Sequence, residues 1–280
     1  MMDNSFGKIL ITGANGMLGQ DLCPMLEDCG YEVIETDIDN LDITNELEVR
    51  RVISDVQPDF VIHCAAYTNV DKAEDEPDVA NKINTKGAEY LAKACQSIDA
   101  TLVYVSTDYV FDGTKNTPYQ PDDKTNPINV YGESKLNGEL TVINNCKKHY
   151  ITRTSWLYGH HGKNFVETMI SLAQQPELKV VDDQIGCPTW TVDLSDAIIT
   201  LIEEEAPYGI YHACGGGQTT WYGFAKEIFK QTGINANILP CTTDEFQRKA
   251  KRPKYSVMDN KELLRDWKLA LQEYIELRVD

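Results

Sequence analysis

The sequence predicts an α/β protein with a doubly wound parallel sheet. Strand-like and helix-like segments alternate along the first half of the chain, and the strand-like segments are apolar along nearly their whole length. The chain has 280 residues, enough to bury a large core as one domain or as a main domain with a smaller lobe. Because strands of continuous apolar residues are buried on both faces, helices are expected on both sides of the sheet.

The expected sheet strands follow one another through residue 156. They are KILITG, YEVIETD, PDFVIHCAA, ATLVYVST and HYITRTSW, at residues 8–13, 31–37, 58–66, 100–107 and 149–156. Apolar residues recur at helical spacing between these strands, which predicts helices at 17–30, 47–57, 78–98 and from about 129 onward.

After residue 156 the alternation loosens. Helical patterns occur at 164–175, 191–205, 220–233 and 269–279, with short strands at 178–183 and 209–214. We therefore expect a main domain over residues 1–156, to which later segments return, and a smaller lobe over residues 157–280. A cleft is expected between them.

The composition excludes several kinds of partner. The net charge of −18 and a pI near 4.6 argue against nucleic acid or an anionic membrane as the main partner. No apolar run approaches the ~20 residues that a membrane-spanning helix needs. The acidic start MMDNSF leads straight into a strand, and the eight cysteines include no CxxC pair. These features predict a cytoplasmic protein with reduced cysteines and no zinc motif.

Three glycines at G-x-x-G-x-x-G spacing, Gly13, Gly16 and Gly19, lie between the first strand and the first helix. Glycines at that place allow a tight turn and let a pyrophosphate approach the backbone at the helix N-terminus. The segment therefore predicts a dinucleotide site, to which Asn15, Met17 and Leu18 would also belong. A second glycine-rich loop, GGGQTTW at 215–221, lacks a following Lys-Ser/Thr, and we expect Thr219 or Thr220 to cap the next helix instead.

Asp37 ends the second strand about 20 residues beyond the glycine turn, where an acid can bind the adenosine ribose hydroxyls. The alternative is an ordinary turn aspartate. Because no arginine lies in GANGMLGQD to meet a 2′-phosphate, NADH is favoured over NADPH. Further cofactor contacts are expected from residues at the ends of the later strands and from the segment after Asp37: Asp42, Ile43, Ala65, Ala66, Tyr67, Thr68 and Val105.

Tyr131 and Lys135 are four residues apart in NVYGESKLNGE, so they share one helix face. A free phenol has a pKa near 10, and acting near neutrality would require about 4 kcal/mol of stabilisation of the phenolate. A lysine charge about 4 Å away contributes about 4 kcal/mol at an effective dielectric constant of 20. The pair therefore predicts that Tyr131 is a proton donor whose pKa is lowered by Lys135. The alternative is that both side chains lie on a solvated surface and have no chemical role.

The glycine spacing, the segment VSTDYVFDG and the Tyr131–Lys135 pair together resemble the extended short-chain dehydrogenase/reductases, which have a Rossmann-like fold. Within them, the chain resembles the dTDP-4-dehydrorhamnose reductase family. The segments that carry this resemblance cover nearly the whole chain in order: AAYTNVDKAEDEP, VSTDYVFDG, NPINVYGESKLNGE, TRTSWLYG, NFVETM, DDQIGCPT and GIYHACGGGQTTW.

The resemblance implies that NADH or NADPH reduces a dTDP-linked 4-keto-6-deoxy sugar, dTDP-4-dehydro-6-deoxy-L-mannose, to dTDP-L-rhamnose. Tyr131 would protonate the ketone oxygen, Lys135 would also hold the nicotinamide ribose, and Thr107 would orient the substrate carbonyl. Ser106 should point to the opposite face of its strand. Residues 1–156 would form the NAD(P)-binding domain and 157–280 mainly the substrate-binding lobe.

Substrate contacts are implied for Asp108, Trp156 and Arg252, the last as a ligand of the pyrophosphate. The alternatives are a core aromatic for Trp156 and a solvated basic patch for Arg252. The Thr107-Asp108-Tyr109 segment lacks the Asp-Glu pair of related dehydratases, which favours simple reduction. Two other functions stay open: a non-catalytic dinucleotide-binding regulatory subunit, and a reductase or epimerase of another nucleotide-linked keto-sugar. The chain could be a monomer or a homodimer, and a divalent metal that bridges some relatives has no assignable ligands here.

Overall fold

The computed structural model describes residues 7–278 and contains a parallel six-stranded sheet. Its strands run in the order β10-β5-β4-β3-β1-β2, so the chain moves outward from β1 in both directions. Their bounds are β1 (Lys8–Thr12), β2 (Glu32–Thr36), β3 (Phe60–His63), β4 (Thr101–Thr107), β5 (His149–Thr154) and β10 (Gly209–His212). The predicted doubly wound α/β fold is confirmed.

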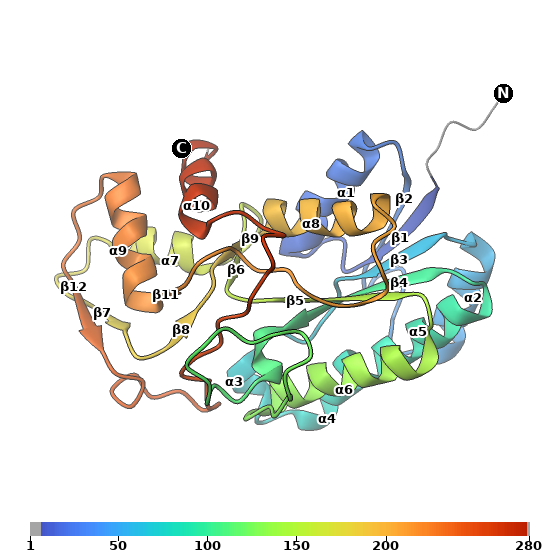
Figure 1. The fold of residues 1–280 in the computed structure, drawn as a ribbon, viewed down its shortest axis with the longest axis horizontal. Coiled ribbons are helices and arrows are strands. Elements are labelled where there is room, and N and C mark those ends of the chain that lie inside the picture. The colour runs from blue at the N-terminus through green and yellow to red at the C-terminus, as the bar shows by residue number, and fades with distance from the viewer. Residues whose placement is uncertain (1–6, 279–280) are drawn as a thin grey trace.

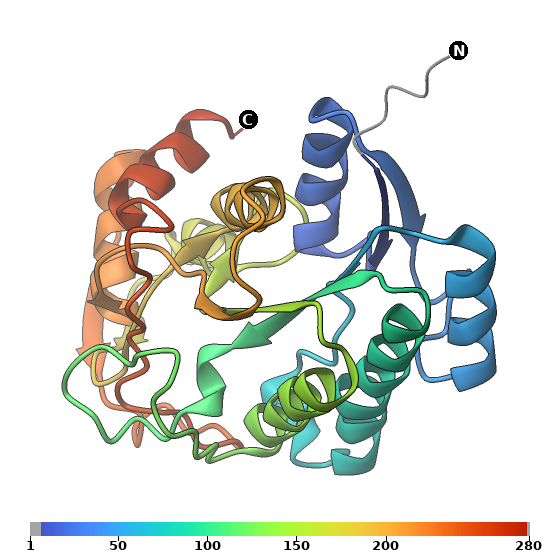
Figure 2. The same cartoon turned by 45° about the vertical axis from the view of Figure 1, so that its right-hand side comes forward.

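Helices cover both faces of this sheet (Figure 1). On one face α1 (Met17–Asp28) packs against α8 (Thr191–Glu203), around a core that includes Leu22 and Ile198. The other face carries α2 (Glu46–Val56), α5 (Ala88–Ser97) and α6 (Val130–Asn145). Figure 2 shows the two helical layers on opposite sides of the twisted strands. The burial of β1 and β4 on both sides explains their continuous apolar sequences.

The single helix predicted at 78–98 is interrupted. Helix α4 (Pro77–Asn81) leads into a π-helical turn, Lys82–Gly87, before α5 begins. The wider turn accompanies the bonding of Asn84, whose side chain donates to the Tyr67 carbonyl at 3.1 Å and to the Ser134 hydroxyl at 2.9 Å. Such turns have no sequence signature in hydrophobic periodicity, and they often occur at functional sites.

The C-terminal part forms a separate cluster of helices and short strands beside the sheet (Figure 1). Its elements are β6 (Leu157–Tyr158), α7 (Phe165–Leu172), β7 (Leu178–Val181), β8 (Ile185–Gly186), β9 (Thr189–Trp190), β11 (Thr219–Thr220), α9 (Trp221–Thr232), β12 (Ile238–Cys241) and α10 (Trp267–Glu276). A short helix α3 (Val70–Ala73) and a 3-10 turn (Asp108–Val110) lie on the sheet side.

One of the later segments returns to the main sheet, as expected, and one predicted helix has different bounds. The strand predicted at 209–214 pairs with β5 in the main sheet, and the helix predicted at 269–279 starts earlier and ends at Glu276. Val279 and the N-terminal MMDNSF segment lie outside the described residues. Between residues 7 and 278, no helix is long and apolar enough to span a membrane.

Candidate active site

A cavity of about 970 Å³ lies where the ends of β1, β2, β3, β4 and β5 meet, at the position where the strand order reverses between β1 and β3. Open α/β sheets bind ligands at this place. The cavity is lined by many of the predicted site residues: Gly13, Gly16, Met17, Leu18, Gly19, Asp37, Asp42, Ile43, Ala65, Ala66, Thr68, Val105, Thr107, Asp108, Tyr131, Lys135 and Trp156. Asn15, Tyr67 and Arg252 do not line it.

The glycine loop packs so closely against neighbouring backbone that side chains would not fit at two of its positions. Gly13 has φ +74°, and a Cβ there would lie 2.7 Å from the Ala65 nitrogen. A Cβ on Gly19 would lie 2.5 Å from the Ala14 oxygen, so α1 can approach the loop only if this residue is glycine. Gly16 caps α1 without any side-chain hydrogen bond, which leaves the first-turn amides available to an anion. The loop therefore fits a dinucleotide pyrophosphate.

Asp37 connects the glycine loop to the end of β2. Its carboxylate accepts hydrogen bonds from the backbone N–H of Asn15 at 3.0 Å and of Ile38 at 2.7 Å. Asn15 thus takes part through its backbone rather than by lining the cavity. Asp37 itself lines the cavity, and its role as a ligand of the adenosine ribose stays a prediction.

Lys82 is a cavity-lining cation that sequence reasoning missed. It begins the π-helical turn and lies close enough to Asp42 to lower the pKa of that carboxyl, after the larger contribution of hydrogen bonds from Thr44. Nothing in the sequence separates this lysine from a surface one. Tyr67 turns away from the cavity, because its hydroxyl donates to Glu76 at 2.9 Å and its backbone N–H donates to Asn84 at 2.8 Å.

Tyr131 and Lys135 come from the first turns of α6, which Asn129 caps by accepting from the Gly132 N–H at 2.7 Å. Gly132 is required there, since a Cβ would lie 2.2 Å from the Tyr109 carbonyl oxygen. Lys135 is buried, donates from Nζ to the Val105 carbonyl at 2.7 Å and lies 4.1 Å from the centre of the Tyr104 ring. The solvated-surface alternative is therefore wrong for this pair.

The expected lowering of the tyrosine pKa is not present. Burial raises the pKa of Tyr131 to about 12, Thr107 opposes this by a hydrogen bond, and Asp108 adds to it. Burial also lowers the pKa of Lys135 to about 7, against the opposing effects of Glu139 and Cys64. Sequence spacing places the two side chains on one face. It does not account for desolvation, which is the largest influence on both pKa values.

Thr107 is at the carboxyl end of β4, directly against Tyr131. Its hydroxyl donates to Asp108 Oδ1 at 3.0 Å and accepts from the Tyr109 N–H at 3.2 Å. Burial raises the pKa of Asp108 to about 7, although hydrogen bonds from Ser256 and Thr107 oppose this. Ser106 turns toward α6, where its hydroxyl donates to Glu139 Oε1 at 2.5 Å.

Two tryptophans form the wall on the side of the C-terminal elements. Trp156 stacks on Trp221 with ring centres 3.6 Å apart and planes 9° from parallel, and both line the cavity. Trp156 has φ +47°, uncommon for a bulky residue, and a Cβ on Gly186 would lie 2.6 Å from its ring. Trp156 is thus no ordinary core aromatic. Thr220 caps α9 by accepting from the Gly223 N–H at 2.9 Å, as predicted, and this places Trp221 at the cavity.

Arg252 lies beside the site and is already paired. Its Nη1 and Nη2 donate to the two carboxylate oxygens of Asp71 at 3.0 and 2.9 Å. Its side chain is only 16% exposed, so it is not part of a solvated patch. Arg252 therefore lies behind the cavity wall, next to Tyr109, which lines the cavity.

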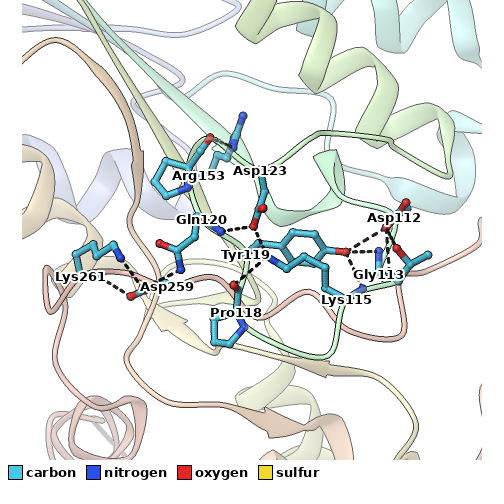
Figure 3. Close-up of polar contacts among 12 residues, drawn as sticks. Asp112, Gly113, Lys115, Pro118, Tyr119, Gln120, Asp123, Arg153, Asp259 and Lys261 are labelled. Carbon is cyan, nitrogen blue, oxygen red and sulfur yellow. Dashed lines mark hydrogen bonds and ion pairs between the residues drawn. The ribbon is translucent and has the colours of Figure 1, made fainter.

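The segment 112–126 between β4 and α6 is held by a polar network (Figure 3). Tyr119 donates from its hydroxyl to Asp112 at 3.1 Å, and Lys115 pairs with Asp123. Gln120 joins the segment to the C-terminal part of the chain by donating to Asp259 at 2.9 Å. The network fixes the long irregular connection between β4 and α6. Within residues 7–278, no three His, Cys, Asp or Glu side chains gather as metal ligands.

Comparisons with known proteins agree with this arrangement. The RmlD substrate binding domain family matches residues 7–278. The spore coat polysaccharide biosynthesis protein SpsK of Bacillus subtilis is 44% identical, with 97% of this chain and 98% of the relative covered.

Two solved structures are closely similar. A dTDP-4-dehydrorhamnose reductase from Clostridium acetobutylicum has a TM-score of 0.94 and 49% identity, covering 96% of this chain and 99% of that one. The same enzyme from Bacillus anthracis, in complex with NADP, has a TM-score of 0.94 and 43% identity, covering 97% and 99%. The chain therefore belongs to the RmlD substrate binding domain family, as its resemblance to the dTDP-4-dehydrorhamnose reductases predicted.

Proposed function

We propose that this protein is an NAD(P)H-dependent reductase that converts dTDP-4-dehydrorhamnose to dTDP-L-rhamnose. The observation that carries the proposal is the convergence of Thr107, Tyr131 and Lys135 on one cavity whose other end is a glycine loop. The two solved relatives named for this reaction support the choice of substrate. A purely regulatory dinucleotide-binding role would not need all three side chains.

The dinucleotide would lie along the glycine loop, with its pyrophosphate at the N-terminus of α1 and its nicotinamide end near Lys135. When bound, it supplies the hydride. Asp37 favours NADH, because its carboxylate would repel a 2′-phosphate. NADPH belongs to the proposal because the Bacillus anthracis relative was solved with NADP and because Lys82 adds a cation at this end of the cavity.

Three residues of this chain would bind the substrate carbonyl, donate the proton and stabilise the phenolate. Thr107 holds the substrate carbonyl by a hydrogen bond. Tyr131 donates its phenolic proton to the ketone oxygen, and a pKa raised to about 12 keeps that proton in place throughout the neutral range. Lys135 would bind the nicotinamide ribose and favour the phenolate left after transfer. Elements of 157–280, with Trp156, would mainly provide the substrate-side wall, and Asp108 and Arg252 would add polar contacts.

The direct test is to measure oxidation of NADH and of NADPH with dTDP-4-dehydrorhamnose, and to identify the product by NMR. UDP- and GDP-linked 4-keto-6-deoxy sugars serve as matched alternatives. The proposal expects turnover with at least one dinucleotide and preference for the dTDP-linked ketone. Tight dinucleotide binding without oxidation of either dinucleotide on any of these ketones would contradict it and favour the regulatory role.

A further inference from the structure

A buried ion pair continues the row of side chains that Tyr131 and Lys135 begin on α6. Glu139 is one helical turn beyond Lys135, so the three lie on one face. Its carboxylate accepts from Arg153 Nε at 2.9 Å and from Nη2 at 2.7 Å. The two side chains are 1% and 3% exposed, and the contact has the bidentate geometry of strong arginine–carboxylate pairs.

This pair connects the segments that carry the proposed catalytic residues. Glu139 also accepts from the hydroxyl of Ser106, which directly precedes Thr107 in β4. Arg153 is in β5, directly before the cavity-lining Thr154. Its Nη1 donates to the Pro121 carbonyl at 3.1 Å, which joins Arg153 to the segment 112–126 (Figure 3). One buried charge pair thus joins α6, β4, β5 and that segment.

The surroundings of Lys135 make its charge sensitive to Glu139. Burial holds the pKa of Lys135 near 7, and Glu139 is the strongest neighbour that raises it, followed by Cys64. The other groups around the ammonium are the Tyr104 ring and the Val105 carbonyl. His63 faces it as a neutral ring, because burial and then Lys135 lower the pKa of His63 to about 3.

A histidine and a tyrosine next to the ion pair are both neutral. His212 is beside Arg153, and burial followed by that guanidinium lowers the pKa of His212 to about 3. Tyr104, between Lys135 and Glu139, has its pKa raised by burial and then by Glu139, so it stays a neutral phenol. Glu139 is therefore the acidic group that acts most strongly on Lys135.

We propose that Glu139 is a positioning residue: its bonds to Arg153 and Ser106 fix α6 against β4 and β5, which keeps Lys135 beside Tyr131 and Thr107, and its charge favours the protonated lysine. The consequence for catalysis rests on the proposed function, whereas the consequence for dinucleotide binding does not. Lys135 loses its proton as the pH rises through its pKa. Removing the Glu139 charge lowers that pKa further, so every property that needs the ammonium should be lost at a lower pH.

The test replaces the pair as a whole, because Glu139→Gln alone would leave Arg153 buried without its counter-charge. In Glu139→Gln/Arg153→Met the NADH dissociation constant, followed by fluorescence, should begin to rise with pH about one pH unit earlier than in the wild type. The alkaline fall of kcat should move by the same amount. Glu139→Met/Arg153→Leu carries the same expectation and provides the result if the first variant does not fold.

The matched control is Asp193→Asn/Arg265→Met, which removes another bidentate pair at 2.9 and 3.1 Å from the far side of the sheet. Its pH profile should equal that of the wild type. An unchanged alkaline midpoint of NADH binding in a folded Glu139 variant would overturn the inference. If the wild type binds NADH but reduces no keto-sugar, the proposed function fails, and the binding titration alone still decides the role of Glu139.

Discussion

The two walls of the cavity are built in different ways. The wall proposed for the dinucleotide, here called the dinucleotide wall, is mainly backbone: the turn at Gly13–Gly19 and the ends of β1, β2 and β3, each in a contiguous strand–turn–helix segment. The opposite wall is made of large side chains from distant parts of the chain, such as Trp156 and Trp221. If the proposed function holds, the difference teaches that binding of the dinucleotide depends on the exclusion of side chains from the glycine loop, whereas recognition of the sugar depends on large side chains.

The largest effect on the dinucleotide wall is expected from a single added methyl group, which should disturb the glycine loop. In Gly19→Ala the new Cβ meets the Ala14 oxygen at 2.5 Å and the Gly13 oxygen at 2.6 Å, and neither backbone atom can move aside cheaply. Overpacking of this kind costs about 1–3 kcal/mol of folding stability, so the melting temperature should fall and NADH should bind more weakly to the distorted loop. Isothermal titration measures the affinity.

Gly16→Ala is the control within the same loop. Its Cβ would meet only the Gly13 oxygen, at 3.1 Å, so the melting temperature should fall much less than in Gly19→Ala. Equal losses of stability in the two variants would mean that close packing of α1 against the loop is not what these glycines provide.

A change in the wall of large side chains should affect the keto-sugar and leave NADH binding unchanged. Trp221→Ala removes the partner of Trp156 and should raise KM for the keto-sugar roughly threefold to tenfold, since aromatic stacking contributes about 0.5–1.5 kcal/mol beyond burial. NADH affinity should stay unchanged, and Trp221→Phe should recover most of the loss. Steady-state kinetics with separate dinucleotide titration would make the comparison. A larger effect on NADH binding than on KM would contradict the division between the walls.

A comparable effect is expected within the dinucleotide wall, where it concerns the choice between two dinucleotides and not the strength of binding. Asp37→Ala removes the charge that would repel a 2′-phosphate and should move the NADPH:NADH affinity ratio toward NADPH by about tenfold, or about 1.4 kcal/mol. Asp39→Ala, at an exposed position two residues on, should leave the ratio unchanged. Wild-type protein that binds NADPH tenfold more tightly than NADH would show that Asp37 does not set the preference.

The same difference between the walls explains what the sequence could predict. The sheet strands, the glycine turn and the Tyr131–Lys135 face follow from spacing and periodicity within short segments. Trp221 and Lys82 could not be placed, because they reach the cavity only through the path of the C-terminal elements and through a π-helical turn. Arg252 shows a further limit, since its pairing with Asp71 joins residues far apart in the sequence. The pKa values of Tyr131 and Lys135 depended on burial, which spacing does not show.

The central claim is that Tyr131 supplies the proton in a reduction carried out between these walls. Tyr131→Phe removes one hydroxyl and keeps the ring, so the melting temperature and NADH affinity should be preserved. Tyr109→Phe is the matched control, because it removes the hydroxyl of the neighbouring ring, whose centre is 5.8 Å away.

The decisive measurement is the single-turnover rate of NADH oxidation by dTDP-4-dehydrorhamnose in these two variants. Positioned proton transfer contributes roughly 10²–10⁴-fold, so the rate of Tyr131→Phe should fall by that factor while Tyr109→Phe stays within about tenfold of the wild type. A Tyr131→Phe protein that binds NADH normally and reduces the keto-sugar at more than about a tenth of the wild-type rate would contradict the account.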